Sequence, residues 1–138
     1  MVSREPCSIT TILGSCAAVC LFDPRTRTGG MNHFLLPRGG ARQFEPARYG
    51  DVAVELLLRQ VLAAGANAGA LQAKLFGGAH VLSTEPAKAE DLGTQNTDAA
   101  RAELARLKVP VVAHDVGGRR GRKLVFSTDD GRAWVKLL

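Results

Sequence analysis

Two residues with reactive side chains, Cys16 and His33, stand close enough in the sequence to meet across one β-hairpin. A free cysteine thiol has a pKa of about 8.5, and a neighbouring imidazolium can lower that pKa by several units. The resulting thiolate attacks carbonyl carbon atoms at neutral pH without help from a metal ion. The pair therefore suggests acyl-transfer chemistry, with Cys16 as the nucleophile and His33 as its base.

The expected hairpin joins a buried apolar strand at residues 16–22 to a second strand at residues 31–36. The intervening Asp-Pro-Arg-Thr sequence at 23–26 has strong turn chemistry. If these four residues form the loop, Cys16 falls directly opposite His33. Directly opposed residues have Cβ atoms about 4.5–5.5 Å apart, within reach of a thiol–imidazole hydrogen bond.

Small residues precede the cysteine, because Gly14 and Ser15 interrupt the chain where the buried strand resumes. They allow the backbone N–H groups of Ser15 and Cys16 to turn toward a bound carbonyl oxygen. Such donors stabilise the oxyanion of an acyl-transfer intermediate, and losing one typically costs about 2.7–4 kcal/mol. We expect these two N–H groups to form an oxyanion site.

Structural roles for the same residues are the alternative. A cysteine in an apolar strand commonly serves as a small buried hydrophobic residue. A histidine beside Phe34 and Leu35 can equally be a core or surface residue with satisfied hydrogen bonds. A turn that includes residues 29–30 would also shift the register and separate the pair.

A metal site is not expected. Cys16 and Cys20 are four residues apart on one strand, which separates them by about 13 Å. Zinc holds its sulfur ligands at about 2.3 Å, so the two thiols cannot share one ion. His80 and His114 show no ligand spacing. We expect no metal and no other cofactor.

The order of elements favours the α+β class over a doubly wound parallel sheet, because strands predominate and two helices are inserted among them. With 138 residues and 46% hydrophobic content, residues 1–138 suit a single domain. The patterns predict strands at 8–13, 16–22, 31–36, 71–76, 109–114, 123–127 and 133–137. They predict one helix from Asp51 to a stop at Gly65, and another capped by Asn96 or Thr97 and running through Leu107.

Charge and cysteine content bound the partners and the compartment. The net charge of +5 is not accompanied by a nucleic-acid-binding motif, which favours a basic face that meets acidic partners over nucleic acid. Three cysteines without a C-x-x-C pair fit a reducing compartment. With no apolar run of about 18 residues and no secretory leader, we expect a cytoplasmic protein without membrane insertion.

Several motifs together resemble the CheD family of chemoreceptor glutamine deamidases. The resemblance rests on TTILGSC at 10–16, VCLFDP at 19–24, GGMNHFLLP at 29–37 and AKLFGGA at 73–79. It continues through Leu92-Gly93 with Asn96, and through Asp115 with Gly117-Gly118 and Gly121-Arg122-Lys123. It covers nearly the whole chain in order.

The resemblance implies a single-domain α/β/β sandwich with a Cys-His-Thr active site. Carried over by position, Cys16 is the nucleophile, His33 is the base, and Thr10 is the third member. The adjacent Thr11 stays open as an alternative to Thr10. Family members usually have a longer leader before the first threonine, whereas nine residues precede Thr10 here, which leaves the order of the first strand open.

The implied activity is hydrolysis of glutamine side chains of methyl-accepting chemotaxis receptors to glutamate, with release of ammonia. Gly77 and Gly78 are expected either to border the substrate groove or to form plain turns. A CheC-like phosphatase is a further implied partner. Two alternatives stay open: a non-catalytic adaptor that binds receptors or a CheC-like phosphatase, and a cysteine protease or transglutaminase that uses the same nucleophile and base.

Overall fold

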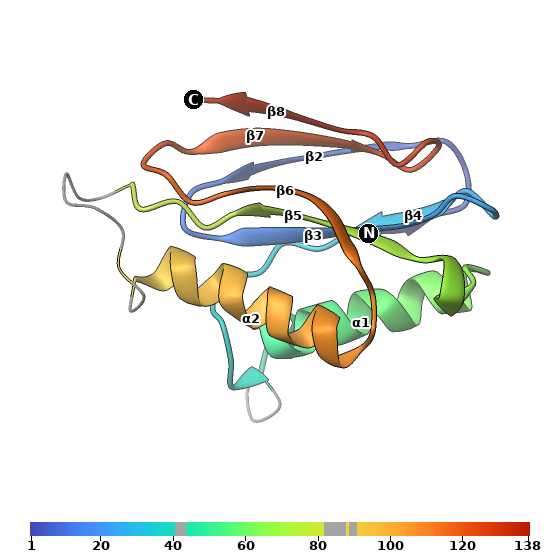
Figure 1. Cartoon of the computed structure of the whole chain (residues 1–138), viewed down its shortest axis with the longest axis horizontal. Coiled ribbons are helices and arrows are strands. Elements are labelled where there is room, and N and C mark those ends of the chain that lie inside the picture. Colours follow the sequence, from blue (N-terminus) through green and yellow to red (C-terminus); the bar gives the residue numbers. More distant parts are fainter. Residues whose placement is uncertain (41–43, 82–87, 89–90) are drawn as a thin grey trace.

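A computed structural model, which describes residues 1–40, 44–81, 88 and 91–138, has three layers (Figure 1). Two helices cover one face of a five-stranded sheet, and a three-stranded sheet packs on its other face. The strands of the larger sheet lie in the order β1 (Val2–Ser3), β4 (Thr28–Met31), β3 (Ala17–Asp23), β5 (Gln72–Gly77) and β6 (Val111–Val116). The strands of the smaller sheet lie in the order β2 (Ser8–Leu13), β7 (Arg122–Ser127) and β8 (Ala133–Leu137). The helices are α1 (Gly50–Ala63) and α2 (Leu92–Arg106), with 3-10 turns at Pro46–Arg48 and Ala68–Ala70. The expected single-domain α/β/β sandwich of the α+β class is confirmed.

Strand β3 lies at the centre of this stack, and all seven of its residues are buried. Its side chains alternate between two cores, as the pleat of a strand requires. Val19 and Leu21 are among those that face the helices, where they join Leu57 of α1 and Leu104 of α2. Cys20 and its alternate neighbours face the smaller sheet. Burial on both faces explains why β3 reads as an unbroken apolar run.

Strand β2 is buried on one face only, and its exposure alternates accordingly. Leu13 is fully buried between the sheets, and Ile9 packs against the same core. Thr11 is half-buried on this inner face, whereas Thr10 and Ile12 are exposed on the outer face. The two adjacent threonines therefore point to opposite sides of the smaller sheet.

The register of the β3–β4 hairpin differs from the predicted one. Asp23 pairs with Thr28, so the loop comprises residues 24–27 and begins one residue later than expected. The carboxylate of Asp23 accepts the Arg25 N–H at 2.8 Å, which draws Asp23 out of the loop and to the end of the strand. Each residue of β3 therefore pairs with a residue two positions later in the second strand than predicted. Because side chains alternate with a period of two, every side chain keeps its predicted face.

Two predicted boundaries are wrong. The strand expected at 31–36 ends at Met31, because the side-chain Oδ1 of Asn32 accepts the Val19 N–H at 2.8 Å in place of a main-chain carbonyl. The second helix starts at Leu92 after an Asp91 N-cap, so Asn96 lies inside it and does not cap it.

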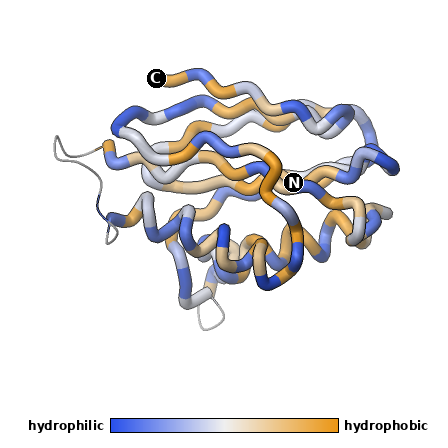
Figure 2. The backbone as a smooth tube through the Cα atoms, viewed as in Figure 1, coloured by the Kyte–Doolittle hydropathy of each residue, from blue (hydrophilic) through white to orange (hydrophobic). Residues whose placement is uncertain are grey.

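Apolar residues recur along the strands that face the interior, whereas several of the connecting turns are hydrophilic (Figure 2). No helix within the described residues is long and apolar enough to cross a membrane.

Two phenylalanines provide a matched test of the core. Phe34 is fully buried between the larger sheet and the helices, whereas Phe44 is 99% exposed. We expect Phe34→Ala to lower the free energy of unfolding by about 3–5 kcal/mol, because it leaves a cavity. Phe44→Ala should change it by no more than about 0.5 kcal/mol. Urea titration of both variants measures this difference, and equal small effects would contradict the placement of Phe34.

Candidate active site

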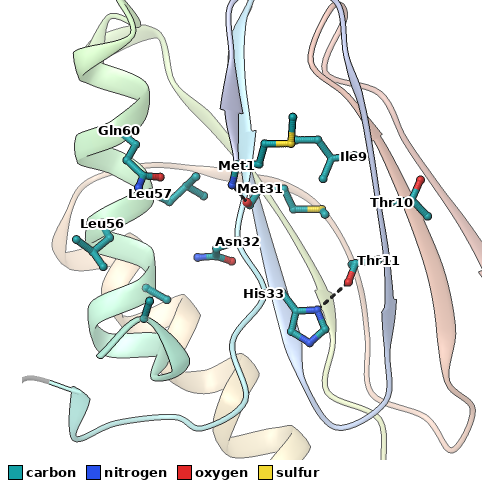
Figure 3. A pocket seen from close by; sticks show the side chains of 12 residues that line it. Met1, Ile9, Thr10, Thr11, Met31, Asn32, His33, Leu56, Leu57 and Gln60 are labelled. Carbon is teal, nitrogen blue, oxygen red and sulfur yellow. Dashed lines mark hydrogen bonds between the residues drawn. The ribbon is translucent and has the colours of Figure 1, made fainter. Parts of the chain in front are cut away.

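Thr11 and His33 meet across the gap between the two sheets. The hydroxyl Oγ1 of Thr11 lies 2.7 Å from Nδ1 of His33, and Figure 3 shows this hydrogen bond. Thr10 points away from the histidine, because successive residues of β2 face opposite sides. The expectation that Thr10 orients His33 is therefore wrong in its geometry, and the alternative residue, Thr11, makes the contact.

The protonation of His33 follows from its surroundings. Partial desolvation lowers the pKa of His33 from its ordinary value of 6.5 although the residue is exposed at the surface, and this direction favours the neutral ring at pH 7. Thr11 is a neutral hydroxyl, and it supplies no charge that would stabilise an imidazolium. When Nδ1–H donates to Thr11, the lone pair of Nε2 is left free to accept a proton.

Cys16 lies in the turn between β2 and β3, half-buried against the core between the sheets. Ala17 pairs with Phe34 in an isolated bridge, so Cys16 and His33 are diagonal neighbours on the opposite face of that pair. Diagonal neighbours have Cα atoms about 7–8 Å apart, not the closer spacing of directly opposed residues. Within the described part of the chain, no hydrogen bond joins the Cys16 thiol to the His33 ring.

The thiol is not activated in the free protein. Burial raises the pKa of Cys16 above 9.0, and a hydrogen bond from its own backbone N–H offsets this only in part. This differs from the imidazolium-stabilised thiolate expected from sequence, because His33 is itself desolvated and uncharged. The resting pair is a neutral thiol beside a neutral imidazole.

The turn that carries Cys16 is held through its carbonyl groups. The Gly14 oxygen accepts from the Ala79 N–H at 2.9 Å, and the Cys16 oxygen accepts from the Gly78 N–H at 2.8 Å. Among the described residues, the Ser15 N–H has no acceptor, and the Cys16 N–H contacts only its own sulfur. Both are thus available to an oxygen atom brought to the thiol, as an oxyanion site requires.

Gly77 and Gly78 lie directly behind this turn. Both have positive φ angles, 105° and 69°, which favour glycine. A side chain at Gly77 would collide with the Cys16 carbonyl, and one at Gly78 would meet Thr97 and Gly93 of α2. The structure gives both glycines a packing role in support of the turn that carries Cys16, and their contact with substrate stays a prediction.

An open cavity of about 380 Å³ adjoins Thr11 and His33. It lies between α1 and β2, at the edge of the larger sheet (Figure 3). Its walls are mainly apolar, with polar groups at Asn32 and Gln60; the apolar residues include Met1, Ile9, Met31, Leu56 and Leu57. A protein segment that reaches the histidine can rest in this cavity.

Asn96 is the residue of the site that sequence reasoning assigned to a different role. It is fully buried in α2, and its Nδ2 donates to the Ser15 carbonyl at 2.9 Å and to the Leu35 carbonyl at 3.0 Å. Two features of the sequence could have indicated this tertiary contact: asparagine is unfavourable in a helix interior, and Asn96 is among the residues that carry the family resemblance.

Metal-binding side chains do not gather near the site. Within the described residues, no group of three or more His, Cys, Asp or Glu side chains is placed to hold an ion. His80 faces Asp91 at 3.6 Å, and His114 contacts Arg101 at 3.0 Å.

Comparison with known proteins finds one family. A family model described as CheD chemotactic sensory transduction matches residues 35–137. "Probable chemoreceptor glutamine deamidase CheD 1" of Anaeromyxobacter dehalogenans is 51% identical over 137 residues, covering 99% of this chain and 79% of the relative. "Probable chemoreceptor glutamine deamidase CheD" of Trichlorobacter lovleyi is 49% identical, covering 94% of this chain and 80% of the relative. The protein of that name in Stenotrophomonas maltophilia is 44% identical over all 138 residues and 69% of its own length.

The raised pKa of the thiol predicts a distinctive reactivity. In the free protein, we expect the rate of Cys16 alkylation by iodoacetamide to rise with pH about a midpoint above 9, because only the thiolate reacts. Mass spectrometry of the cysteine peptides separates Cys16 from Cys7 and from the buried Cys20. A midpoint below 9 would show instead that a positive charge stabilises the thiolate.

Proposed function

This chain belongs to the CheD family, and we propose that it is a protein-glutamine deamidase that hydrolyses glutamine side chains of methyl-accepting chemotaxis receptors to glutamate. The observation that carries the proposal is the His33–Thr11 hydrogen bond. It lies on the same side of the larger sheet as the Cys16 turn, whose Ser15 and Cys16 N–H groups are not taken up by any main-chain carbonyl among the described residues. These are a nucleophile, a base with its orienting group, and an oxyanion site, which acyl transfer requires together.

In the first step, the Cys16 sulfur attacks the carboxamide carbon of the glutamine. The thiol proton passes to Nε2 of His33 as the new S–C bond forms, and the carbonyl oxygen becomes an oxyanion. The N–H groups of Ser15 and Cys16 stabilise this oxyanion. Because the thiol is protonated at rest, proton transfer accompanies the attack and does not precede it.

The intermediate then collapses. The C–N bond breaks, and the imidazolium of His33 returns its proton to the departing nitrogen, which leaves as ammonia. The product is a thioester between Cys16 and the former glutamine. His33, neutral again, removes a proton from water as the water oxygen attacks the thioester, and glutamate and the free thiol are released.

The cavity between α1 and β2 supports a protein as the substrate. It adjoins His33 and is open along an apolar wall, so it can receive residues that flank the target glutamine. Each turnover replaces a neutral amide on the receptor by a carboxylate, and such a charge change can bias a two-state signalling element. A cytoplasmic location accords with a receptor substrate of this kind.

A non-catalytic adaptor is the second candidate, and docking on a CheC-like phosphatase belongs to it. The presence of Cys16 and of the Thr11–His33 pair favours catalysis, and such docking would be an added role. A protease or transglutaminase would use the same nucleophile. Products separate these cases: deamidation gives ammonia and glutamate, proteolysis gives shorter fragments, and transglutamination consumes an amine.

Replacement of the nucleophile gives the direct test of activity. We expect the wild type to add the mass of a glutamine-to-glutamate conversion to receptor cytoplasmic fragments and to release ammonia. Cys16→Ser and Cys16→Ala should lower this rate by more than about 1,000-fold with the fold intact. Mass spectrometry with circular dichroism as the folding control measures both. Activity retained by Cys16→Ala would exclude Cys16 as the nucleophile.

The two adjacent threonines provide a matched pair for the base. Thr11→Val keeps the shape of the side chain but removes the hydrogen bond to His33, and we expect kcat to fall about 100-fold with KM unchanged. Thr10→Val leaves the Thr11–His33 hydrogen bond in place, although Thr10 also lines the cavity, so it should lower kcat far less than Thr11→Val does. Ammonia release under saturating receptor fragment measures both, and the reverse order of effects would contradict the assignment of Thr11.

A further inference from the structure

We propose that Asn96 is a positioning residue that aims the oxyanion-binding N–H of Cys16, an inference that rests on the deamidase function proposed above. Asn96 projects from α2, which contributes no other hydrogen bond to the carbonyl groups of the nucleophile turn among the described residues. It acts from behind the turn, on the side away from the open N–H groups.

The planar peptide unit transmits this effect. The carbonyl of Ser15 and the N–H of Cys16 belong to one trans peptide, in which they point in opposite directions. When Asn96 holds the Ser15 oxygen at 2.9 Å, it also fixes the direction of the Cys16 N–H. Apart from its own sulfur, that N–H has no acceptor among the described residues, and in the proposed mechanism the substrate oxygen lies opposite it.

The second hydrogen of the same amide holds the segment after β4, which carries the proposed base. Nδ2 of Asn96 donates to the Leu35 carbonyl at 3.0 Å, two residues after His33. The N–H of Leu35 donates to the Arg48 carbonyl at 2.9 Å, so the segment is fixed from both sides. One amide group thus joins the segment before the nucleophile to the segment after the base.

Close packing between α2 and the turn that carries Cys16 fixes the position of the Asn96 side chain. Gly93 lies against Gly78, where an added Cβ on either residue would overlap the backbone of the other. Since the Gly78 N–H also holds the Cys16 carbonyl at 2.8 Å, the start of α2 and the turn share one support. The helix can therefore hold Asn96 in fixed register with Cys16.

The other half of the side chain makes no hydrogen bond among the described residues, because Oδ1 of Asn96 is buried without a partner. The contacts that fix the amide are therefore the two made by Nδ2. The geometry assigns the positioning role to Nδ2.

Asn96→Asp tests this assignment with little change of shape, because a carboxylate cannot donate to either carbonyl. We expect kcat for receptor deamidation to fall about 100-fold with KM unchanged, which is the effect of losing one oxyanion donor. Acylation of Cys16 by p-nitrophenyl acetate should fall by a similar factor, since it passes through an oxyanion at the same position. Alkylation of Cys16 by iodoacetamide, which forms no oxyanion, should stay within about twofold of the wild-type rate.

Asn96→Ala is the second variant, because it removes both donors without adding a charge. Thr97→Val is the matched control, since the Thr97 hydroxyl donates only to carbonyls of its own helix, Gly93 and Thr94. This control should deamidate the receptor fragment and react with both reagents at wild-type rates. Circular dichroism and urea titration follow the fold of all three variants.

The outcomes separate the two proposals. Wild-type kcat in both Asn96 variants would overturn the positioning role while deamidation itself stands. A wild type that releases no ammonia but acylates with the expected dependence on Asn96 would overturn the deamidase function alone. Equal losses in acylation and alkylation, or failure of both Asn96 variants to fold beside a folded Thr97→Val, would assign Asn96 to structure and overturn its positioning role.

Discussion

The site depends on the packing of one sheet against the other, because the hydrogen bond between Thr11 and His33 crosses from β2 to the end of β4. Leu13, Leu124 and Phe126 of the smaller sheet and Met31 and Phe76 of the larger fill the space between them. These side chains set the separation at which a threonine hydroxyl reaches a ring nitrogen. The inter-sheet core therefore stabilises the fold and sets the geometry of the proposed base at the same time.

Burial gives the thiol and the imidazole complementary resting states. Burial raises the pKa of Cys16 and lowers the pKa of His33. The thiol therefore carries the proton that leaves in the proposed first step, and the imidazole has a nitrogen free to accept it. A carboxylate in place of Thr11 would favour the imidazolium, whereas a hydroxyl orients the ring without adding charge. The contacts behind the turn are made to carbonyl groups, so no main-chain carbonyl among the described residues takes up the N–H groups of Ser15 and Cys16, the proposed oxyanion donors. In the proposed mechanism, the thiol is activated when substrate binds and its proton moves to His33.

Much of this arrangement follows from the sequence, and the exceptions have identifiable causes. The bounds of β2 and the fold class are those predicted, and the alternation of Ile9, Thr11 and Leu13 on β2 already separates the inner threonine from the outer one. The resemblance to the family pointed to Thr10, and only the pleat distinguishes the two. The hairpin register was mispredicted because it depends on the Asp23 side chain, whose hydrogen bond to the loop cannot be read from a turn pattern. The hydrogen bonds of Asn96 join three segments that are distant in the chain, so no local pattern identifies the Ser15 and Leu35 carbonyls as its acceptors.

In the proposed mechanism, His33 is a neutral base whose Nδ1–H donates to the hydroxyl of Thr11. Nitrogen-15 NMR of the histidine ring through a pH titration tests it most directly, because the two ring nitrogens have distinct shifts in each tautomer and in the imidazolium. We predict a titration midpoint below 6.5, with the proton on Nδ1 and a bare Nε2 at pH 7. A doubly protonated ring at pH 7, or a neutral ring with its proton on Nε2, would contradict this account.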